Sequence, residues 1–385
     1  MVNGPLWCYF YAMKYVDNEN PMASMRFSCT QVSPNSLVYG TEDDLRKGLS
    51  SIETYAKPER VFVENNCSVS LVGDDVQGIA DQMDLPWPVY AMDSGGMKGS
   101  FEAGYSAASL RIEKEMKTKE KIPASVNVLG LSTVHMKGRE DAEEIRRLLS
   151  LCGIRVISMP GGGSNWEDIM DAPSASLNIV VRDELGLSLA KQMEQDFGTP
   201  YMSCGLPYGT DGTMAWLSEI IEKLGAGELT RASHEAAKLK EFLLRKGNNL
   251  ESLWGPLWFD AVLISSPPSE ALGIAETIRS EWIDTARLVI HAQCETEKST
   301  PAADAIRVVM KNETEIAKDY EDWQGGLVLS SSHETHLLRR MGKSFTGFHI
   351  ALPSHDEVHF SDLPQCGLRG AGYLYEQLWN AKLRR

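Results

Sequence analysis

Short apolar runs alternate with polar, helix-like patterns along almost the entire chain. Each run has four to seven residues and is rich in β-branched or aromatic side chains, which is typical of strands. Several runs are continuously apolar, so we expect strands that are buried on both faces in parallel sheets covered by helices. The predicted strands are 60–63, 125–131, 154–159, 176–181, 259–265, 286–292, 305–310, 325–330 and 348–352.

Amphipathic patterns of helical length fill the intervals between these runs. Residues 41–55, with the sequence TEDDLRKGLSSIETY, follow a glycine. Two further patterns, 138–153 and 183–198, end at Gly153 and Gly198, and glycine is a common helix stop. The alternation of strand and helix predicts an α/β fold of three Rossmann-like units, each a mainly parallel sheet flanked by helices.

The same pattern indicates approximate boundaries for the three units. We expect the first at 1–120, the second at 121–255 and the third at 256–385. A long polar helical pattern at 231–249 is predicted to join the second unit to the third. A length of 385 residues is also too great for one ordinary core and suits two or three domains.

The composition is that of a soluble globular protein, with 43% hydrophobic and 24% charged residues. No apolar run is long enough to span a bilayer, and no basic-then-apolar signal segment opens the chain, so we expect a cytoplasmic protein. The net charge of −15 argues against a nucleic-acid surface and against an anionic membrane surface.

Seven widely spaced cysteines are the main candidates for chemistry. In a cytoplasmic chain they should be reduced, and the absence of a C-x-x-C pair weakens zinc-ribbon and thioredoxin interpretations. The cysteines are Cys8, Cys29, Cys67, Cys152, Cys204, Cys294 and Cys366.

Cys67 follows the predicted strand 60–63, and after Gly73, Asp74 and Asp75 comes the helix-like pattern VQGIADQM at 76–83. Ligands in open α/β sheets bind beyond the carboxyl ends of strands. A thiolate at a helix N-terminus is stabilised by the free N–H groups there and is a good soft-metal ligand. A buried structural thiol is the alternative for any single cysteine. We expect the two aspartates to cap the helix after Cys67.

Cys8 and Cys29 strengthen the metal-ligand hypothesis. Both lie in the first predicted unit, each near the end of an apolar segment, as Cys67 does. Three thiolates at one sheet edge could supply most of an iron–sulfur cluster site, with a fourth ligand from elsewhere, for example from another chain.

The glycines at 161–163 follow a predicted strand and precede Ser164, which with Glu167 fits a capping box. A glycine-rich loop at a helix start can hold an anion, but this one is neither G-x-G-x-x-G nor a P-loop. We therefore predict a tight turn before a capped helix, and no nucleotide bound by this chain.

Two histidines near the C-terminus, His355 and His359, are the candidate catalytic residues. A metal hypothesis also arises for the five histidines of this part of the chain, His333, His336, His349, His355 and His359. The segment HDEVH lacks the glutamate of HExxH, and Pro353 and Pro364 predict that it is a loop, which makes a zinc site the weaker interpretation. We expect one of these histidines to line a substrate pocket and to donate a proton. A hydrogen-bonded loop histidine is the open alternative.

Several longer stretches, in serial order, resemble the nitrogenase component 1 family. Its members include the nitrogenase molybdenum–iron protein, its cofactor scaffold and the dark-operative tetrapyrrole reductases. The segments YAKPE and EDIMDAPSASLNIVV are more similar to the β-type subunit than to the α-type. The matching stretches are GPLWC, VYGTEDDLRKGL, YAKPERVFVENNCSVSLVGDDVQGIA, GGGSNWEDIMDAPSASLNIVV, FGTPYMSCGLPYGTDGTMAWLSEI and HDEVHFSDLPQCGLRGAGYLYEQLWN.

The resemblance implies a set of cluster ligands. Cys8 and Cys67 match cluster-binding cysteines of the family, and Cys29 lies near a segment where relatives place side chains close to the cluster. No residue matches the upstream cysteine of the large nitrogenase P-cluster, so a smaller [4Fe–4S] cubane shared with a partner subunit is expected. The α-type cofactor cysteine falls near Val181 and Arg182, where no cysteine stands. A larger metal cluster is therefore expected only in a partner chain.

The resemblance also implies a function. The chain would be a subunit of the catalytic component of an ATP-dependent, two-component reductase. Its partners would be a homologous α-type subunit, in a heterotetramer, and an ATP-hydrolysing iron protein that supplies electrons for a small-molecule substrate. The alternatives are a non-catalytic scaffold for assembly of a complex metal cluster, and a plain α/β binding protein with structural cysteines.

Overall fold

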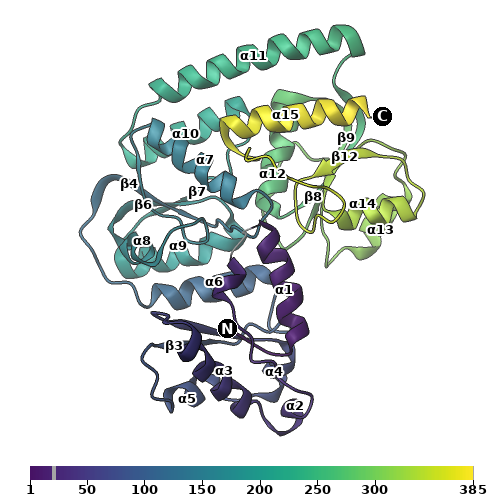
Figure 1. The fold of residues 1–385 in the computed structure, drawn as a ribbon. Helices are drawn as coiled ribbons and strands as arrows, with labels where there is room; N and C mark the ends of the chain where they lie inside the picture. Colours follow the sequence, from purple (N-terminus) through teal and green to yellow (C-terminus); the bar gives the residue numbers. More distant parts are fainter. Residues whose placement is uncertain (20–22, 385) are drawn as a thin grey trace. The chain divides into compact units, whose positions relative to one another are not determined.

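The computed structural model describes residues 1–19 and 23–384, and every ladder between its named strands is parallel (Figure 1). This confirms the predicted fold class, an α/β protein with three parallel sheets flanked by helices. In order across each sheet, the strands are β1 (Val2–Asn3), β2 (Val61–Asn65) and β3 (Val89–Met92); β5 (Arg155–Ser158), β4 (Ile122–Leu129), β6 (Ala175–Val180) and β7 (Tyr201–Ser203); and β10 (Ala305–Val308), β9 (Asp284–Ala292), β8 (Trp258–Ser266), β11 (Leu327–Ser330) and β12 (Thr346–His349).

All nine predicted strand segments overlap strands of the structure. The sequence pattern missed β1, β3 and β7, which have only two, four and three residues. Such short strands carry too few side chains to show a periodicity, and each is defined by the neighbour with which it pairs.

The helices cover the sheets in the manner that the pattern predicted. Among the described residues, no helix combines the length and the apolar character that crossing a bilayer requires. The α-helices are α1 (Leu6–Glu19), α2 (Ser36–Tyr39), α3 (Glu42–Tyr55), α4 (Cys67–Val72), α5 (Val76–Asp81), α6 (Phe101–Glu113), α7 (Gly138–Leu151), α8 (Trp166–Asp171), α9 (Asp183–Phe197), α10 (Thr210–Leu224), α11 (Thr230–Trp254), α12 (Pro268–Thr277), α13 (Glu313–Glu321), α14 (Ser332–Arg340) and α15 (Gly367–Leu383).

The chain divides into two compact units, Met1–Arg111 and Ile112–Arg385. The first unit contains the β1–β3 sheet, and the second contains the other two sheets. Within the second unit, the predicted joining helix is part of α11, which packs against α10 and α15 (Figure 1). The three boundaries proposed from the sequence stay a prediction.

Each unit has its own apolar core. In the second unit, the last five residues of β4, β8 and β9 are all buried, as expected for strands covered on both faces. One continuous apolar cluster there joins residues of β4 and α7 to residues of β8 and α15. The first unit has a smaller core around Leu45, Leu49 and Val63, each with no exposed surface.

A buried ion pair fills the position at which the α-type cofactor cysteine would fall. Arg182 has no exposed surface, and its Nη2 lies 2.6 Å from Oε1 of Glu270 and 3.9 Å from Oδ2 of Asp141. Burial opposes the charge of Arg182, but the neighbouring Glu270 carboxylate raises the pKa of the guanidinium, so Arg182 stays charged. Burial raises the pKa of Glu270, and Arg182 opposes this shift. The pair ties the end of β6 to α12 and α7, and it leaves no thiol at this position.

The predicted capping box at Ser164 is wrong. Oγ of Ser164 accepts a hydrogen bond from N–H of Met159 (2.8 Å), so it closes the glycine turn instead of capping a helix. The N-cap of α8 is Asn165, whose Oδ1 accepts from N–H of Asp168 at 2.8 Å. A capping box is present at Ser331 and Glu334, at the start of α14.

We expect Glu270→Ala to lower the free energy of unfolding by about 3–5 kcal/mol, because it leaves the buried Arg182 without its partner. The matched control is Glu143→Ala, which removes a carboxylate from an exposed pair with Arg139 and should change stability by less than about 0.5 kcal/mol. Guanidinium unfolding followed by fluorescence measures both. The double variant Arg182→Met, Glu270→Leu should recover much of the loss, and failure to do so would contradict the ion-pair explanation.

Candidate functional site

The carboxyl ends of the first sheet's strands meet at one edge. β1, β2 and β3 are parallel, and a parallel bridge joins Val2 to Cys29 on the free side of β1. The segments after β1 and β2, and the one at Cys29, therefore all leave the sheet on the same side. In open α/β sheets this edge is where ligands bind, and Cys8, Cys29 and Cys67 are found on these segments.

Asn66 links two of the three thiols. Its Oδ1 accepts a hydrogen bond from N–H of Val69 (3.0 Å) and so caps α4, the helix that begins with Cys67. Its Nδ2 donates to Sγ of Cys8 at 3.2 Å, and its backbone N–H donates to the carbonyl of Asn3 at 3.1 Å. Cys8 and the helix start that carries Cys67 are thus held together by one amide side chain.

Cys67 is the first residue of α4 and is exposed. Its Sγ accepts a hydrogen bond from the backbone N–H of Gly96 at 3.1 Å. A Cβ at Gly96 would lie 3.3 Å from this sulfur, and one at Gly95 would lie 2.5 Å from Oγ of Ser70. The loop after β3 can reach the thiol because both positions are glycine.

Cys29 lies between the backbones of two neighbouring segments. Its Sγ donates to the carbonyl of Gly4 at 3.3 Å and accepts from N–H of Gln31 at 3.4 Å. Burial raises the pKa of the Cys29 thiol, N–H of Gln31 partly opposes this effect, and the neighbouring Cys8 raises the pKa further. All three predicted cysteines therefore belong to one local group.

The chemistry of this group fits an iron–sulfur cluster. Each of the three sulfurs accepts a hydrogen bond from an N–H group, and such bonds to cluster sulfurs are a principal means of setting a reduction potential. A cubane takes four ligands, whereas residues 1–111 contain only three cysteines. The fourth ligand would have to come from outside this unit.

The other four cysteines lie in the second unit. Cys152 and Cys366 are buried. Burial raises the pKa of the Cys204 thiol to about 12, so it is a poor thiolate ligand near neutral pH. Cys294 is half-buried.

Polar side chains behind the thiols fix the edge of the sheet. Nδ2 of the buried Asn3 donates to Oδ1 of Asn65 at 3.1 Å, and its Oδ1 accepts from Oγ1 of Thr30 at 3.0 Å. The prediction that the two aspartates cap the helix after Cys67 is confirmed for Asp75 and wrong for Asp74. Asp75 caps α5, and Asp74 accepts from N–H of Thr41 at the start of α3 (2.6 Å).

An exposed aromatic surface surrounds Cys8 on α1. Trp7, Phe10 and Tyr11 are 70%, 54% and 57% exposed. The rings of Trp7 and Tyr11 stack at a centroid distance of 6.3 Å. Exposed apolar groups of this kind beside a binding site are typical of protein–protein contacts.

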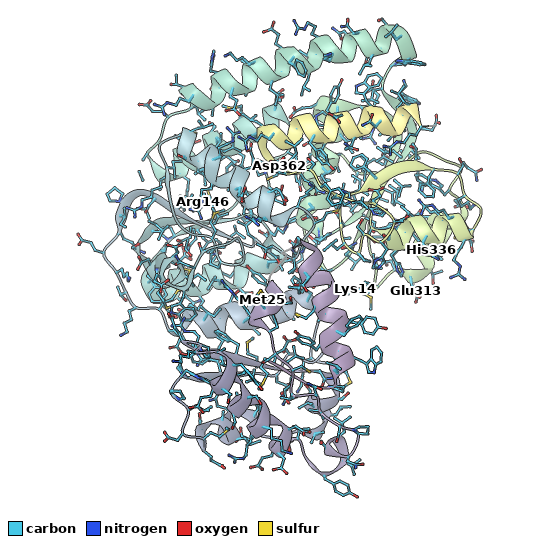
Figure 2. All side chains as sticks on the ribbon, viewed as in Figure 1. Lys14, Met25, Arg146, Glu313, His336 and Asp362 are labelled. Atoms are coloured by element: carbon cyan, nitrogen blue, oxygen red, sulfur yellow. The ribbon has the colours of Figure 1, made fainter. Side chains whose placement is uncertain are left out.

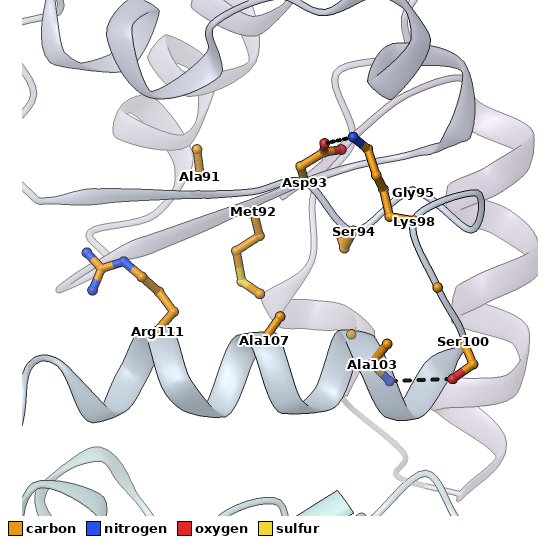
Figure 3. A pocket seen from close by; sticks show the side chains of 12 residues that line it. Ala91, Met92, Asp93, Ser94, Gly95, Lys98, Ser100, Ala103, Ala107 and Arg111 are labelled. Carbon is orange, nitrogen blue, oxygen red and sulfur yellow. Dashed lines mark hydrogen bonds and ion pairs between the residues drawn. The ribbon is translucent and has the colours of Figure 1, made fainter. Parts of the chain in front are cut away.

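A pocket of about 260 Å³ in the first unit lies beside the loop whose Gly96 N–H reaches Cys67 (Figure 3). The loop 93–100, which supplies the Gly96 N–H, forms one wall, and α6 forms the other. Its charged groups are paired, since Nζ of Lys98 lies 3.0 Å from Asp93 and the guanidinium of Arg111 lies 4.3 Å from the ring centre of Tyr90. The pocket can therefore accept a small, mostly apolar molecule.

The predicted catalytic histidines lie in the loop between β12 and α15, as their flanking prolines indicated. His355 is exposed, and its backbone N–H donates to Oγ of Ser332. His359 instead faces Glu357, with its Nε2 3.8 Å from Oε2. His349, another of the C-terminal histidines considered as metal ligands, ends β12 and lies beside the same Glu357, with its Nδ1 3.9 Å from Oε2.

Comparison with known proteins identifies the family and the fold of the chain. Residues 1–382 match the family described as Nitrogenase component 1 type Oxidoreductase. The chain is 28% identical over 260 residues to the nitrogenase iron-molybdenum cofactor biosynthesis protein NifE of Clostridium pasteurianum, covering 66% of this chain and 54% of that protein. It is 22% identical over 374 residues to one of the subunits of the light-independent protochlorophyllide reductase of Chloroherpeton thalassium, covering 92% of this chain and 69% of that protein.

A solved structure described as "Nitrogenase Cp1 at pH 6.5" has the same fold. Its TM-score is 0.75 at 18% sequence identity, with 100% of this chain and 88% of that chain covered. The chain therefore spans most of that structure but only about half the length of the NifE protein.

We expect Asn66→Ala to lower the free energy of unfolding by about 1 kcal/mol, because α4 loses its cap. Asn66→Asp should keep the cap, since a carboxylate also accepts from N–H of Val69. It should nevertheless slow the alkylation of Cys8 by iodoacetamide, because a negative charge beside Sγ disfavours the thiolate. Denaturant unfolding and mass spectrometry of the alkylated peptides measure the two effects.

Asn35→Ala is the matched control, because Asn35 occupies the N-cap position of α2 without making a side-chain cap hydrogen bond. It should leave stability and alkylation unchanged. Equal losses at both positions would mean that Asn66 does not act through its cap.

Proposed function

Since the chain belongs to the nitrogenase component 1 type oxidoreductase family, we propose that it is a subunit of the catalytic component of a nitrogenase-like, ATP-dependent two-component reductase. Cys8, Cys67 and Cys29 would hold one side of a [4Fe–4S] cluster at the interface with a homologous α-type subunit. The chain would receive electrons from an ATP-hydrolysing iron–sulfur protein and serve the reduction of a small-molecule substrate.

One observation carries this proposal: three thiols from distant segments gather at one sheet edge, each with an N–H donor directed at its sulfur. An iron–sulfur cluster supplies one-electron transfer when bound. The residues of this chain would hold it and adjust its potential, through the amide of Asn66 and the backbone N–H groups of Gly96 and Gln31.

The exposed surface of α1 supports the proposed subunit interface. Cys8 and Cys67 are exposed in the single chain, and Trp7 and Tyr11 lie on the same helix as Cys8. A partner subunit that supplies the fourth ligand would bury these aromatic groups and exclude water from the cluster.

For the substrate we propose the pocket beside Cys67, because its wall and the thiol share the 93–100 loop. His355 and His359, in the second unit, remain the proposed proton donors and are considered apart from this pocket. Burial lowers the pKa of His359, although Glu357 opposes this, so the ring is neutral near pH 7. A neutral imidazole donates a proton poorly, which weakens His359 as a donor.

The second candidate is a scaffold for assembly of a complex metal cluster. The similarity to NifE favours it, and so does the exposure of the thiols, since a scaffold has to release its cargo. Incubating the iron-loaded chain with an apo acceptor protein distinguishes the two functions. A scaffold transfers its cluster, whereas a reductase subunit retains it.

We expect Cys67→Ala and Cys8→Ala each to lose most of the iron and sulfide of anaerobically purified protein, because a cubane rarely survives the loss of a thiolate ligand. Cys29→Ala tests the third proposed ligand in the same way. Cys294→Ala, a half-buried cysteine of the second unit, is the control and should keep the metal. Iron analysis and electron paramagnetic resonance measure the outcome. Unchanged iron in Cys67→Ala would end the proposal.

The double variant Trp7→Glu, Tyr11→Glu should weaken assembly with the partner subunit at least about 30-fold, because interfacial aromatic anchors each contribute about 2 kcal/mol. Tyr55→Glu introduces a charge at an 88% exposed position elsewhere in the unit and is the control. Size-exclusion chromatography of the co-expressed subunits measures the change. Equal assembly of both variants would show that α1 is not at the interface.

A further inference from the structure

Two side chains of the loop before α15 converge with one from the end of β12 in the second unit. Oε2 of Glu357 lies 3.9 Å from Nδ1 of His349 and 3.8 Å from Nε2 of His359. All three possible ligand atoms lie within 4.8 Å of one another. The geometry points to a mononuclear site for a divalent transition-metal ion of the zinc class, bound by His349, Glu357 and His359. This site is separate from the cysteines and does not rest on the proposed function.

The tautomer of His349 suits it for metal binding. Its Nε2 lies 3.4 Å from both Oδ1 of Asp356 and Oγ1 of Thr335. These oxygens can accept its proton, which leaves the Nδ1 lone pair free to accept from Oγ of Ser354 or to bind a metal ion. A carboxylate behind the ring is the usual outer partner of a metal-bound histidine, and Asp356 is itself held by Ser332 (2.8 Å) and Arg339.

The spacing of the ligand atoms needs little adjustment. Zinc bonds of about 2.0–2.1 Å in a tetrahedron set ligand atoms about 3.3 Å apart. The separations of 3.8 and 3.9 Å at Glu357 are therefore about half an ångström too long. His349 is only 1% exposed, whereas the other two residues are partly exposed, so an ion can reach the site from solvent.

Existing hydrogen bonds already orient this group. The backbone N–H of His349 donates to Oε2 of Glu357 at 2.9 Å. Oγ of Ser354 lies 2.8 Å from Nδ1 of His349 and 3.4 Å from Nε2 of His359, so this hydroxyl can donate to one ring nitrogen and accept from the other. Within the part of the chain that the structure describes, Glu357 makes no ion pair with a lysine or arginine. A cation between the three groups supplies the positive charge that the carboxylate lacks.

Three protein ligands and one open position would give the site the composition of two histidines and a carboxylate, which zinc commonly adopts. Because the ligands come from the end of β12 and from the following loop, the ion would also hold residues 349–359 in place. The sequence pattern HDEVH alone did not reveal it, since His355 is not a ligand and His349 lies outside the motif.

The test is titration of the full chain with Co²⁺ alone, after removal of bound metal, followed by visible absorption. We expect the chain to bind one equivalent of Co²⁺ and to show d–d bands of nitrogen and oxygen ligation. The same binding should persist in the double variant Cys8→Ala, Cys67→Ala. That variant also excludes sulfur-to-cobalt charge transfer from these two thiols. His359→Ala should lose this binding. Asp356→Ala should weaken it about 10–100-fold through the orientation of His349.

His336→Ala is the matched control, because this exposed histidine lies on α14 in the same unit, away from the proposed ligands (Figure 2). This variant should bind Co²⁺ as the wild-type chain does. Glu357→Gln keeps the size of the side chain but removes the carboxylate. It replaces His359→Ala as the test of the site if that variant fails to fold. Ser354→Ala should bind Co²⁺ at least as tightly, because its hydroxyl competes for Nδ1. Absence of binding in the wild-type chain, or unchanged binding in both Glu357→Gln and His359→Ala, would overturn the inference.

Discussion

The candidate cluster site depends on one side chain, Asn66, which forms hydrogen bonds in two directions. Its Oδ1 caps the helix that presents Cys67, and its Nδ2 donates to Sγ of Cys8. An amide can do both because it carries an acceptor and a donor on one rigid group. A serine or an aspartate would cap the helix as well but would bring no N–H group to the sulfur. The position of one thiol and the stability of the other's helix are therefore coupled.

This coupling needs backbones that approach one another closely. A Cβ at Gly4 would lie 2.6 Å from Cγ of Asn66, and one at Gly96 would lie 3.3 Å from Sγ of Cys67. The parallel strands bring the segments to the same edge, and glycine then permits the last few tenths of an ångström. The buried amide of Asn3, bonded to Asn65, holds the edge from behind. Polar contacts, rather than apolar packing, determine the arrangement of the thiols.

Local patterns were sufficient to predict the longer strands and the position of Cys67 directly after one of them. They were not sufficient for β1 or for the partners of Asn66, because Asn66 and Cys8 are 58 residues apart. One signal was available, since an asparagine directly before a helix is a common N-cap. Ser164 shows the opposite case, in which a sequence motif was present but its predicted contact was not. Its hydroxyl accepts a hydrogen bond from N–H of Met159 instead of capping the helix. His349 was among the histidines considered as metal ligands, but the sequence did not identify Glu357 and His359 as its neighbours, because they come from the loop that follows its strand.

The exposed thiols and the exposed face of α1 bear on whether the proposed partner is an identical chain or a homologous one. A symmetric pair of identical chains would bring two copies of the same patch together, and with them six cysteines from the two first units. A cubane uses only four ligands, so two thiols would remain at a water-excluded interface without iron. A homologous chain that offers a single ligand matches the three thiols of this one. The count of sulfurs therefore favours a heterodimer over a homodimer as the unit that encloses the cluster.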